Sequence, residues 1–289
     1  MVAPIRPRSA TAGHRSSSGS AAHPAAATPR VAAALRGPRR PATIVARSPY
    51  AVYVRDGEDV LAVLARDAVV VPCGLTTTWE HVGDVREVVL GGGRCSVDGR
   101  EVRVGRLVDA TVREVGAART APEVDTLLDE VGRDLPGLPD GTYPALREDD
   151  PAAATALLGR GPGLTPLGDD VLAGWLVGRY ARGHRGGRVA SAAVAHAPAR
   201  TTAVSAALLA HAVRGEAIAE LRDFVADPAD SAALAALRAV GHTSGTGLAL
   251  GVALSLPHPS PLCKQPDAIH LPKRSSSFHS ADARRRGDR

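Results

Sequence analysis

The chain is poor in aromatic residues and in cysteine, and it has no long apolar run. Aromatic residues make up 3% of the 289 positions and hydrophobic residues 44%, so a folded core must be built from Ala, Val and Leu. Cys73, Cys95 and Cys263 have no spacing typical of metal ligands or paired cysteines, which excludes a disulfide framework and favours a reducing compartment. No apolar run reaches the roughly 20 residues that a membrane-spanning helix needs. We therefore expect a cytoplasmic protein without a membrane partner.

Acidic residues are absent from residues 1–42, which contain seven arginines. Residues 257–289 contain seven basic and three acidic residues, a net charge of +4. Because the whole chain carries +5 and its two ends carry +7 and +4, the middle of the chain carries −6. A nucleic-acid-binding domain needs a basic surface on the fold itself. We therefore expect no nucleic-acid partner.

The composition changes three times along the chain. Residues 1–42 offer little to bury and are predicted to be disordered, as an extended start in a GC-rich bacterial gene or, alternatively, an organelle transit peptide. Residues 43–118 form a predicted β-rich domain of short strands, with a hairpin turn at Asp98-Gly99. Residues 119–256 have the apolar spacing of helices, and residues 257–289 are a predicted disordered or non-native tail. Strands followed by helices predict an α+β fold, with an N-terminal antiparallel β barrel or sandwich followed by an all-helical domain.

The stretch from Gly159 to Gly178 combines a glycine-rich loop with the start of a helix. Thr165 and the proline after it are typical of an N-cap and first helical position, and Asp169 and Asp170 follow where the helix dipole favours negative charge. Such a loop commonly binds an anion through backbone N–H groups. Because neighbouring helical side chains diverge by about 100°, we expect one aspartate to face a ligand or metal and the other the helix N-terminus. The alternative is a capped tight loop without a ligand.

A second glycine motif, Gly241-His-Thr-Ser-Gly-Thr-Gly247, again leads into an apolar helix. With one gap it aligns with the first motif, so that Thr243 corresponds to Thr165 and Gly251 to Gly174. We predict an internal pseudo-repeat in which two helices cross closely at their glycines and both N-termini face one cavity. Thr165 and Asp170 should then lie close to Thr243 and Ser244.

A third polar segment contains Thr201 and Ser205, which share a face near the start of another predicted helix. These hydroxyls either bind a ligand or serve the helix itself, with Thr201 as its N-cap and Ser205 bonded to the backbone. His211 has no carboxylate or second ligand four residues away and is interpreted as an ordinary helix histidine.

The run Gly161-Pro-Gly-Leu-Thr-Pro-Leu-Gly-Asp-Asp170, with Leu-Ala-Gly shortly after it, resembles the signature of the AllH-like family. Members of that family include a subunit of oxamate carbamoyltransferase. The resemblance extends over most of the chain between about residues 44 and 256. The chain departs from the family at Leu167, where a serine is usual, and at Gly247, where an aspartate is usual. The second departure removes a carboxylate from the predicted site.

The resemblance implies a subunit of a complex that joins carbamoyl phosphate and oxamate to give oxalurate, or runs in reverse in allantoin catabolism. Its implied partners are the other subunits and a small anionic substrate, and Mg²⁺ is the candidate cofactor, with Asp170 as its ligand. His242 is either a proton donor or a hydrogen-bonding spacer. The candidate catalytic residues are Asp169, Asp170 and His242, and the candidate substrate-binding residues are Gly161, Gly163, Thr165, Thr201, Ser205, Thr243, Ser244, Gly245 and Thr246. Two alternatives are a non-catalytic scaffold subunit and an independent phosphate-ester or nucleotide-binding enzyme.

Overall fold

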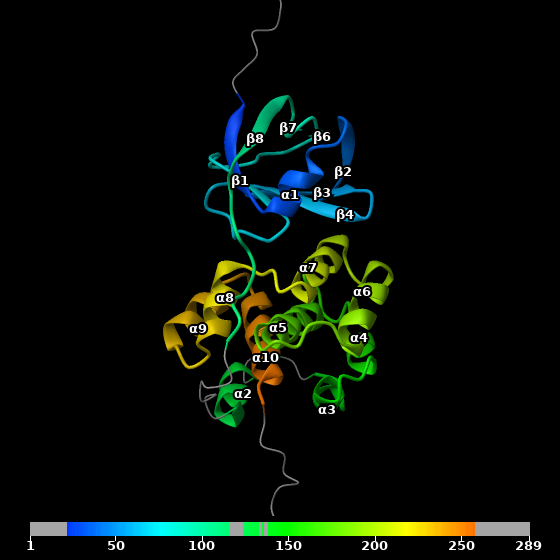
Figure 1. Ribbon diagram of the computed structural model, residues 1–289, viewed down its shortest axis with the longest axis vertical. Helices are drawn as coiled ribbons and strands as arrows, with labels where there is room; N and C mark the ends of the chain where they lie inside the picture. Colours follow the sequence, from blue (N-terminus) through cyan, green and yellow to red (C-terminus); the bar gives the residue numbers. More distant parts are fainter. Residues whose placement is uncertain (1–21, 116–123, 133–134, 136–137, 258–289) are drawn as a thin grey trace, which may run out of the picture. The chain divides into compact units, whose positions relative to one another are not determined.

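The computed structural model describes residues 22–115, 124–132, 135 and 138–257 (Figure 1). Residues 1–21 and 258–289, both predicted to be disordered, lie outside this part of the chain. The strands are β1 (His23–Ala27), β2 (Arg40–Ser48), β3 (Ala51–Asp56), β4 (Asp59–Leu64), β5 (Gly74–Thr77), β6 (Val88–Gly91), β7 (Arg94–Val97) and β8 (Arg100–Leu107). The helices are α1 (Pro29–Ala34), α2 (Val124–Gly132), α3 (Thr142–Arg147), α4 (Ala152–Leu157), α5 (Leu167–Ala181), α6 (Arg188–Arg200), α7 (Ala203–Val213), α8 (Ala219–Ala226), α9 (Ser231–Arg238) and α10 (Ser244–Ser255).

The eight strands form a closed barrel in the order β1-β5-β4-β3-β2-β6-β7-β8. Most neighbouring strands are antiparallel, but β1 pairs with β8 and β4 pairs with β5 in parallel. The fold is therefore α+β with an N-terminal barrel, as predicted, whereas the prediction of an antiparallel barrel was only partly right. Strand β1 closes the barrel between β5 and β8, two strands that come much later in the chain.

The segment 22–42, predicted to be disordered, is part of this barrel. It forms β1, α1 and the start of β2, so the barrel begins 20 residues before the predicted boundary at residue 43. Val31 and Leu35 are buried in the barrel core, and Thr28 caps α1 by accepting a hydrogen bond from the Val31 N–H. The composition concealed these elements because Ala and Pro dominate the segment and β-branched residues are scarce.

The hairpin between β7 and β8 turns at Asp98 and Gly99, as predicted. Both residues have positive φ, 46° and 80°, which is the backbone of a type I′ turn. The Asp98 carboxylate also accepts hydrogen bonds from the backbone N–H groups of Arg86 and Glu87. This turn therefore fixes the register of the two strands and ties them to the loop before β6.

In the helical domain, α5 and α10 pack against each other at the centre, and the other helices surround them (Figure 1). A Cβ atom added to Gly174 would lie 2.0 Å from the Leu248 carbonyl oxygen, and one added to Gly251 would lie 2.0 Å from that of Val171. The predicted close crossing is confirmed, although each glycine meets the backbone of the other helix rather than the opposite glycine. None of the helices in the described part of the chain is long and apolar enough to cross a membrane.

Candidate functional site

Asp169 is fully buried at the start of α5, and hydrogen bonds occupy both its carboxylate oxygens. Oδ1 accepts from the Gly159 N–H at 2.8 Å, and Oδ2 accepts from the hydroxyl of Ser205 at 2.7 Å and from that of Thr201. The carboxylate thus joins the first glycine loop to the start of α7. The N-cap of α7 is Thr202, which accepts from the Ser205 N–H, and not Thr201 as one interpretation had it.

Asp170, the next residue, has a different environment. Its side chain is buried, and its Oδ2 has no hydrogen-bond partner in the described structure. Burial raises the pKa of Asp170 to about 7, and the neighbouring charge of Asp169 acts in the same direction, while hydrogen bonding by Ser244 and Thr165 opposes the rise. The environments of the two aspartates differ, as expected from their divergence on the helix. The partners are not the predicted ones, because Gly159, Thr201 and Ser205 hold Asp169, and not the N–H groups at the start of α5.

The two glycine motifs meet at the side chains of Thr165 and Ser244. Their hydroxyl oxygens are 2.9 Å apart, although 79 positions separate the residues in the sequence. Gly247 lies against the same place, because a Cβ atom added to it would be 3.0 Å from the Cβ of Asp170. A carboxylate at position 247 would therefore stand beside Asp170, and this chain has only glycine there.

A cavity of about 720 Å³ lies between the motifs. Residues from both motifs line it: Arg160, Gly161, Pro162, Gly163, Leu164, Thr165, Leu167 and Gly168 from the first, and His242, Thr243 and Ser244 from the second, with Leu138. Neither Pro166 nor Thr243, the N-cap residues of α5 and α10, caps its helix with a side chain. Arg160 and His242 add donors, and no carboxylate of the described residues lines the cavity. Such a surface suits an anion.

Six of the predicted site residues line this cavity: Gly161, Gly163, Thr165, His242, Thr243 and Ser244. Thr201 and Ser205 instead hold Asp169, and Gly245 and Thr246 lie outside the lining. Gly245 has a packing role, since a Cβ atom there would be 1.8 Å from the Leu237 carbonyl oxygen. Arg160 also lines the cavity but was not among the predicted site residues. It is the only cation in the first motif, and a cation in a glycine-rich loop indicates an anion site.

The donor groups around Asp170 do not fit a Mg²⁺ site made by the protein alone. The described residues contain no group of three or more His, Cys, Asp or Glu side chains that could hold a metal ion. Both oxygens of Asp169 are already used, which leaves one carboxylate and two hydroxyls. Mg²⁺ takes six oxygen ligands in near-octahedral geometry.

A comparison with known proteins finds one similarity, and it covers most of the residues that line this cavity. No solved structure matches the chain. Residues 157–256 match the family described as oxamate carbamoyltransferase subunit AllH. This segment contains both glycine motifs, α5 and α10, whereas the barrel lies outside it. The resemblance carried by the two motifs is thereby confirmed: the part of the chain that forms the cavity is similar to the AllH subunit of oxamate carbamoyltransferase.

Proposed function

We propose that the chain is a subunit of an oxamate carbamoyltransferase complex and that the cavity between the glycine motifs binds its small anionic substrate. The observation that carries this proposal is the meeting of Thr165 and Ser244 above the unpartnered oxygen of Asp170. Two helix N-termini without side-chain caps converge there, and Arg160 supplies a positive charge. Carbamoyl phosphate and oxamate are both small anions of the kind that such a surface binds.

Asp170 acts in this proposal as a positioning residue. Its carboxyl does not line the cavity, but it contacts the two hydroxyls that do. When Asp170 is ionised it accepts hydrogen bonds from Thr165 and Ser244, and when it is protonated it can donate one instead. With a pKa of about 7, both forms are present at neutral pH. The protonation of Asp170 therefore sets whether the hydroxyls donate to the protein or to a bound anion.

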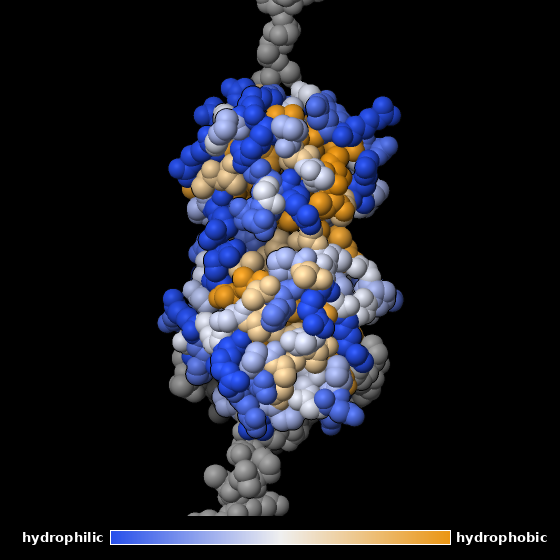
Figure 2. Space-filling view, turned by 90° about the vertical axis from the view of Figure 1, so that its right-hand side faces the viewer, coloured by the Kyte–Doolittle hydropathy of each residue, from blue (hydrophilic) through white to orange (hydrophobic). Residues whose placement is uncertain are grey.

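Assembly with other subunits is consistent with the surface of the barrel. Tyr50, Val69 and Val70 are large apolar residues that stay exposed there, and hydrophobic areas reach the surface in Figure 2. Exposed apolar groups of this kind often mark contacts between proteins. We infer that the other subunits of the complex are the partners.

A non-catalytic scaffold subunit is the second candidate, and the glycines favour it. Gly168, Gly174, Gly245 and Gly251 are all explained by close approach to a neighbouring backbone, without any ligand. Close packing does not explain Gly163, because a Cβ atom there would meet nothing within 4 Å. Its φ of +98° still favours glycine. The two candidates differ in whether the cavity hydroxyls affect catalysis.

Co-expression with the other subunits tests the proposal. We expect the chain to co-purify with them and the complex to transfer a carbamoyl group between carbamoyl phosphate and oxamate. Ser244→Ala and Thr165→Val should lower kcat/KM by about 10- to 100-fold, the effect of losing a hydrogen bond to a charged group. Thr155→Val is the matched control, because Thr155 is exposed on α4 and does not line the cavity. Unchanged kcat/KM in both cavity variants would leave the scaffold as the better account.

Asp170→Asn should stabilise the fold above pH 7. The folded pKa of about 7 lies above the ordinary value of 3.8, so ionisation of the buried carboxyl destabilises the folded state. That destabilisation is absent below about pH 4, grows between pH 4 and 7, and is complete above pH 7. The gain should therefore be small at pH 4.5 and on the order of a few kcal/mol at pH 8, measured by urea unfolding.

Asp169→Asn is the matched control for this prediction. Its amide would face three donors that the carboxylate now satisfies, so we expect a loss of about 2 kcal/mol or more at both pH values. If Asp170→Asn lowers stability at pH 8, the carboxylate stabilises the helix start and its assigned role is wrong. Full activity of Asp170→Asn in the assembled complex would also contradict that role.

A further inference from the structure

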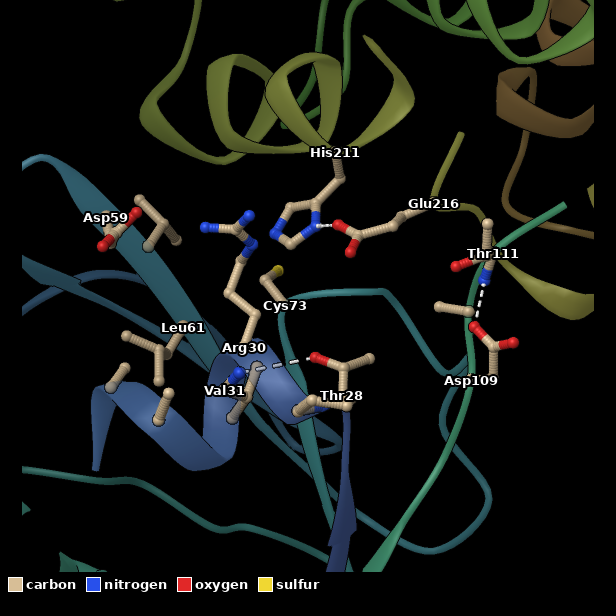
Figure 3. Close-up of a pocket in the computed structure, with 15 residues that line it drawn as sticks. Thr28, Arg30, Val31, Asp59, Leu61, Cys73, Asp109, Thr111, His211 and Glu216 are labelled. Carbon is tan, nitrogen blue, oxygen red and sulfur yellow. Dashed lines mark hydrogen bonds and ion pairs between the residues drawn. The ribbon is translucent and has the colours of Figure 1, made fainter. Parts of the chain in front are cut away.

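A second cavity, of about 600 Å³, lies between the barrel and α7 and shares no residue with the cavity of the glycine motifs (Figure 3). Residues of α1, of β4, of the end of α7 and of the loop between α7 and α8 line it. The ionisable groups along it are Arg30, Asp59, Cys73, Asp109, His211 and Glu216. None of them belongs to the function proposed above.

His211 and Glu216 form a pair at the wall of this cavity. His211 is buried, and its Nδ1 lies 2.5 Å from Oε2 of Glu216. Burial alone would raise the pKa of Glu216, but the hydrogen bond with His211, together with Arg214, lowers it below its ordinary value. An ionised Glu216 accepts a hydrogen bond from the Nδ1–H of the ring. In the neutral imidazole Nε2 is then the hydrogen-bond acceptor, and it faces the cavity (Figure 3).

The interpretation of His211 as an ordinary helix histidine is therefore incomplete. The sequence shows no carboxylate four residues away, but one follows at the fifth position, after the end of α7. The chain turns back there at Gly215, with φ +73°, and Glu216 then pairs with Thr111 in an isolated β-bridge. This turn brings the carboxylate to the ring.

Arg30 supplies a positive charge to the same cavity. Its side chain is exposed and makes no hydrogen bond or ion pair within the described structure. Figure 3 shows its guanidinium and the imidazole of His211 pointing toward one another. The position is not explained by the stability of α1, because Arg30 lies in the first turn, where the helix dipole disfavours a cation.

The remaining groups limit the charge of a ligand. Burial raises the pKa of the Cys73 thiol to about 12, so Cys73 is neutral. Asp59 is exposed on β4, and Asp109 accepts a hydrogen bond from the Thr111 N–H at 2.8 Å, which lowers its pKa. Two carboxylates at the edges of the cavity repel an anion with several charges. A ligand with one negative charge is therefore favoured.

We propose that this cavity binds a small monocarboxylate that carries an N–H or O–H group next to its carboxylate. The carboxylate lies on the guanidinium of Arg30, whose planar donors match its two oxygens. The neighbouring N–H or O–H donates to Nε2 of His211. Glu216 holds the imidazole in the required tautomer from the other side. The proposal uses no residue of the glycine motifs, so it stands or fails independently of the proposed function.

Glycolate and acetate are matched probes, because they differ in the hydroxyl that should reach His211. With histidine rings labelled with ¹³C and ¹⁵N in the full chain, we expect glycolate to shift the His211 signals to saturation at constant ionic strength. His211→Gln assigns those signals. Acetate should bind about fivefold more weakly, the effect of one hydrogen bond. Equal affinity for the two acids, or no saturable shift of His211, would overturn the proposal.

Arg30→Gln should abolish the glycolate response while the chain stays folded, because the side chain is exposed and unpaired. Arg36→Gln is the matched control: it removes an exposed arginine just after α1 that does not line the cavity, and it should respond as the unchanged chain does. Ser244→Ala should also respond fully, since it alters only the other cavity. Glycolate binding by Arg30→Gln at unchanged affinity, or a response confined to His242 in the other cavity, would contradict the site.

Discussion

A chain that begins at residue 43 will fail to form the barrel, whereas one that begins at residue 22 will form it. Strand β1 is hydrogen-bonded to β5 on one side and to β8 on the other, so its removal opens the barrel and leaves two unpaired edges. Arg40–Ala42, the part of β2 that pairs with β6, is lost as well. So are Val31 and Leu35, which are buried in the barrel core. We expect a loss comparable to the whole stability of a small domain, about 5–15 kcal/mol.

The two tryptophans make this result measurable, because each domain contains one. Trp79 lies in the barrel, where the ring of His23 meets it edge-on at 5.6 Å and Arg100 lies over it at 3.6 Å. Trp175 lies on α5 and can be replaced by phenylalanine to leave Trp79 as the sole reporter. In that background the chain from residue 43 should show red-shifted emission without a cooperative unfolding transition. If its emission and unfolding midpoint match those of the chain from residue 22, β1 does not close the barrel.

The failure to predict β1 has a physical cause. The sequence His23-Pro-Ala-Ala-Ala27 lacks the β-branched and aromatic residues that indicate a strand, and its partners lie roughly 50 and 80 positions later. Tertiary contacts therefore hold it in the sheet and local preference does not. The Asp98-Gly99 hairpin was predictable for the opposite reason, since its backbone conformation depends on its own two residues.

The sequence predicted those parts of the candidate site that depend on neighbouring residues or on the similarity of the two glycine motifs. The similarity of the two motifs indicated that Thr165 and Ser244 would meet. Helix geometry indicated that Asp169 and Asp170 would have different surroundings, but not which groups would bind them. The sequence did not show which aspartate would have both carboxylate oxygens hydrogen-bonded. That depends on Thr201 and Ser205, which tertiary packing brings to Asp169.

The pairing of His211 with Glu216 was not predicted, for a related reason. A search at helical spacing looks four residues ahead, while the partner lies five residues on, beyond the helix end. Turns that end helices can therefore build side-chain pairs that a periodic pattern does not reveal.

Gly251→Leu will destabilise the helical domain by about 3 kcal/mol or more. A Cβ atom at position 251 would lie 2.0 Å from the Val171 carbonyl oxygen and 2.6 Å from the Trp175 nitrogen, both of them backbone atoms. No rotamer relieves this clash, because the Cβ atom itself causes it. The helices α5 and α10 must therefore move apart, which also separates hydrophobic side chains that now touch. Urea unfolding followed by Trp175 emission, with Trp79 replaced by phenylalanine, measures the loss.

Gly132→Ala is the matched control, because a Cβ atom at this last position of α2 would meet nothing within 4 Å. Alanine is favoured over glycine in a helix, so this variant should be neutral or gain up to about 1 kcal/mol. An unfolding midpoint of Gly251→Leu equal to that of the unchanged chain would show that the two helices do not cross at this glycine. Gly251→Ala places the same Cβ atom at the crossing with the smallest added volume. Because Thr165 lies just before α5 and Ser244 begins α10, moving the helices apart should weaken substrate binding by the folded fraction of this variant.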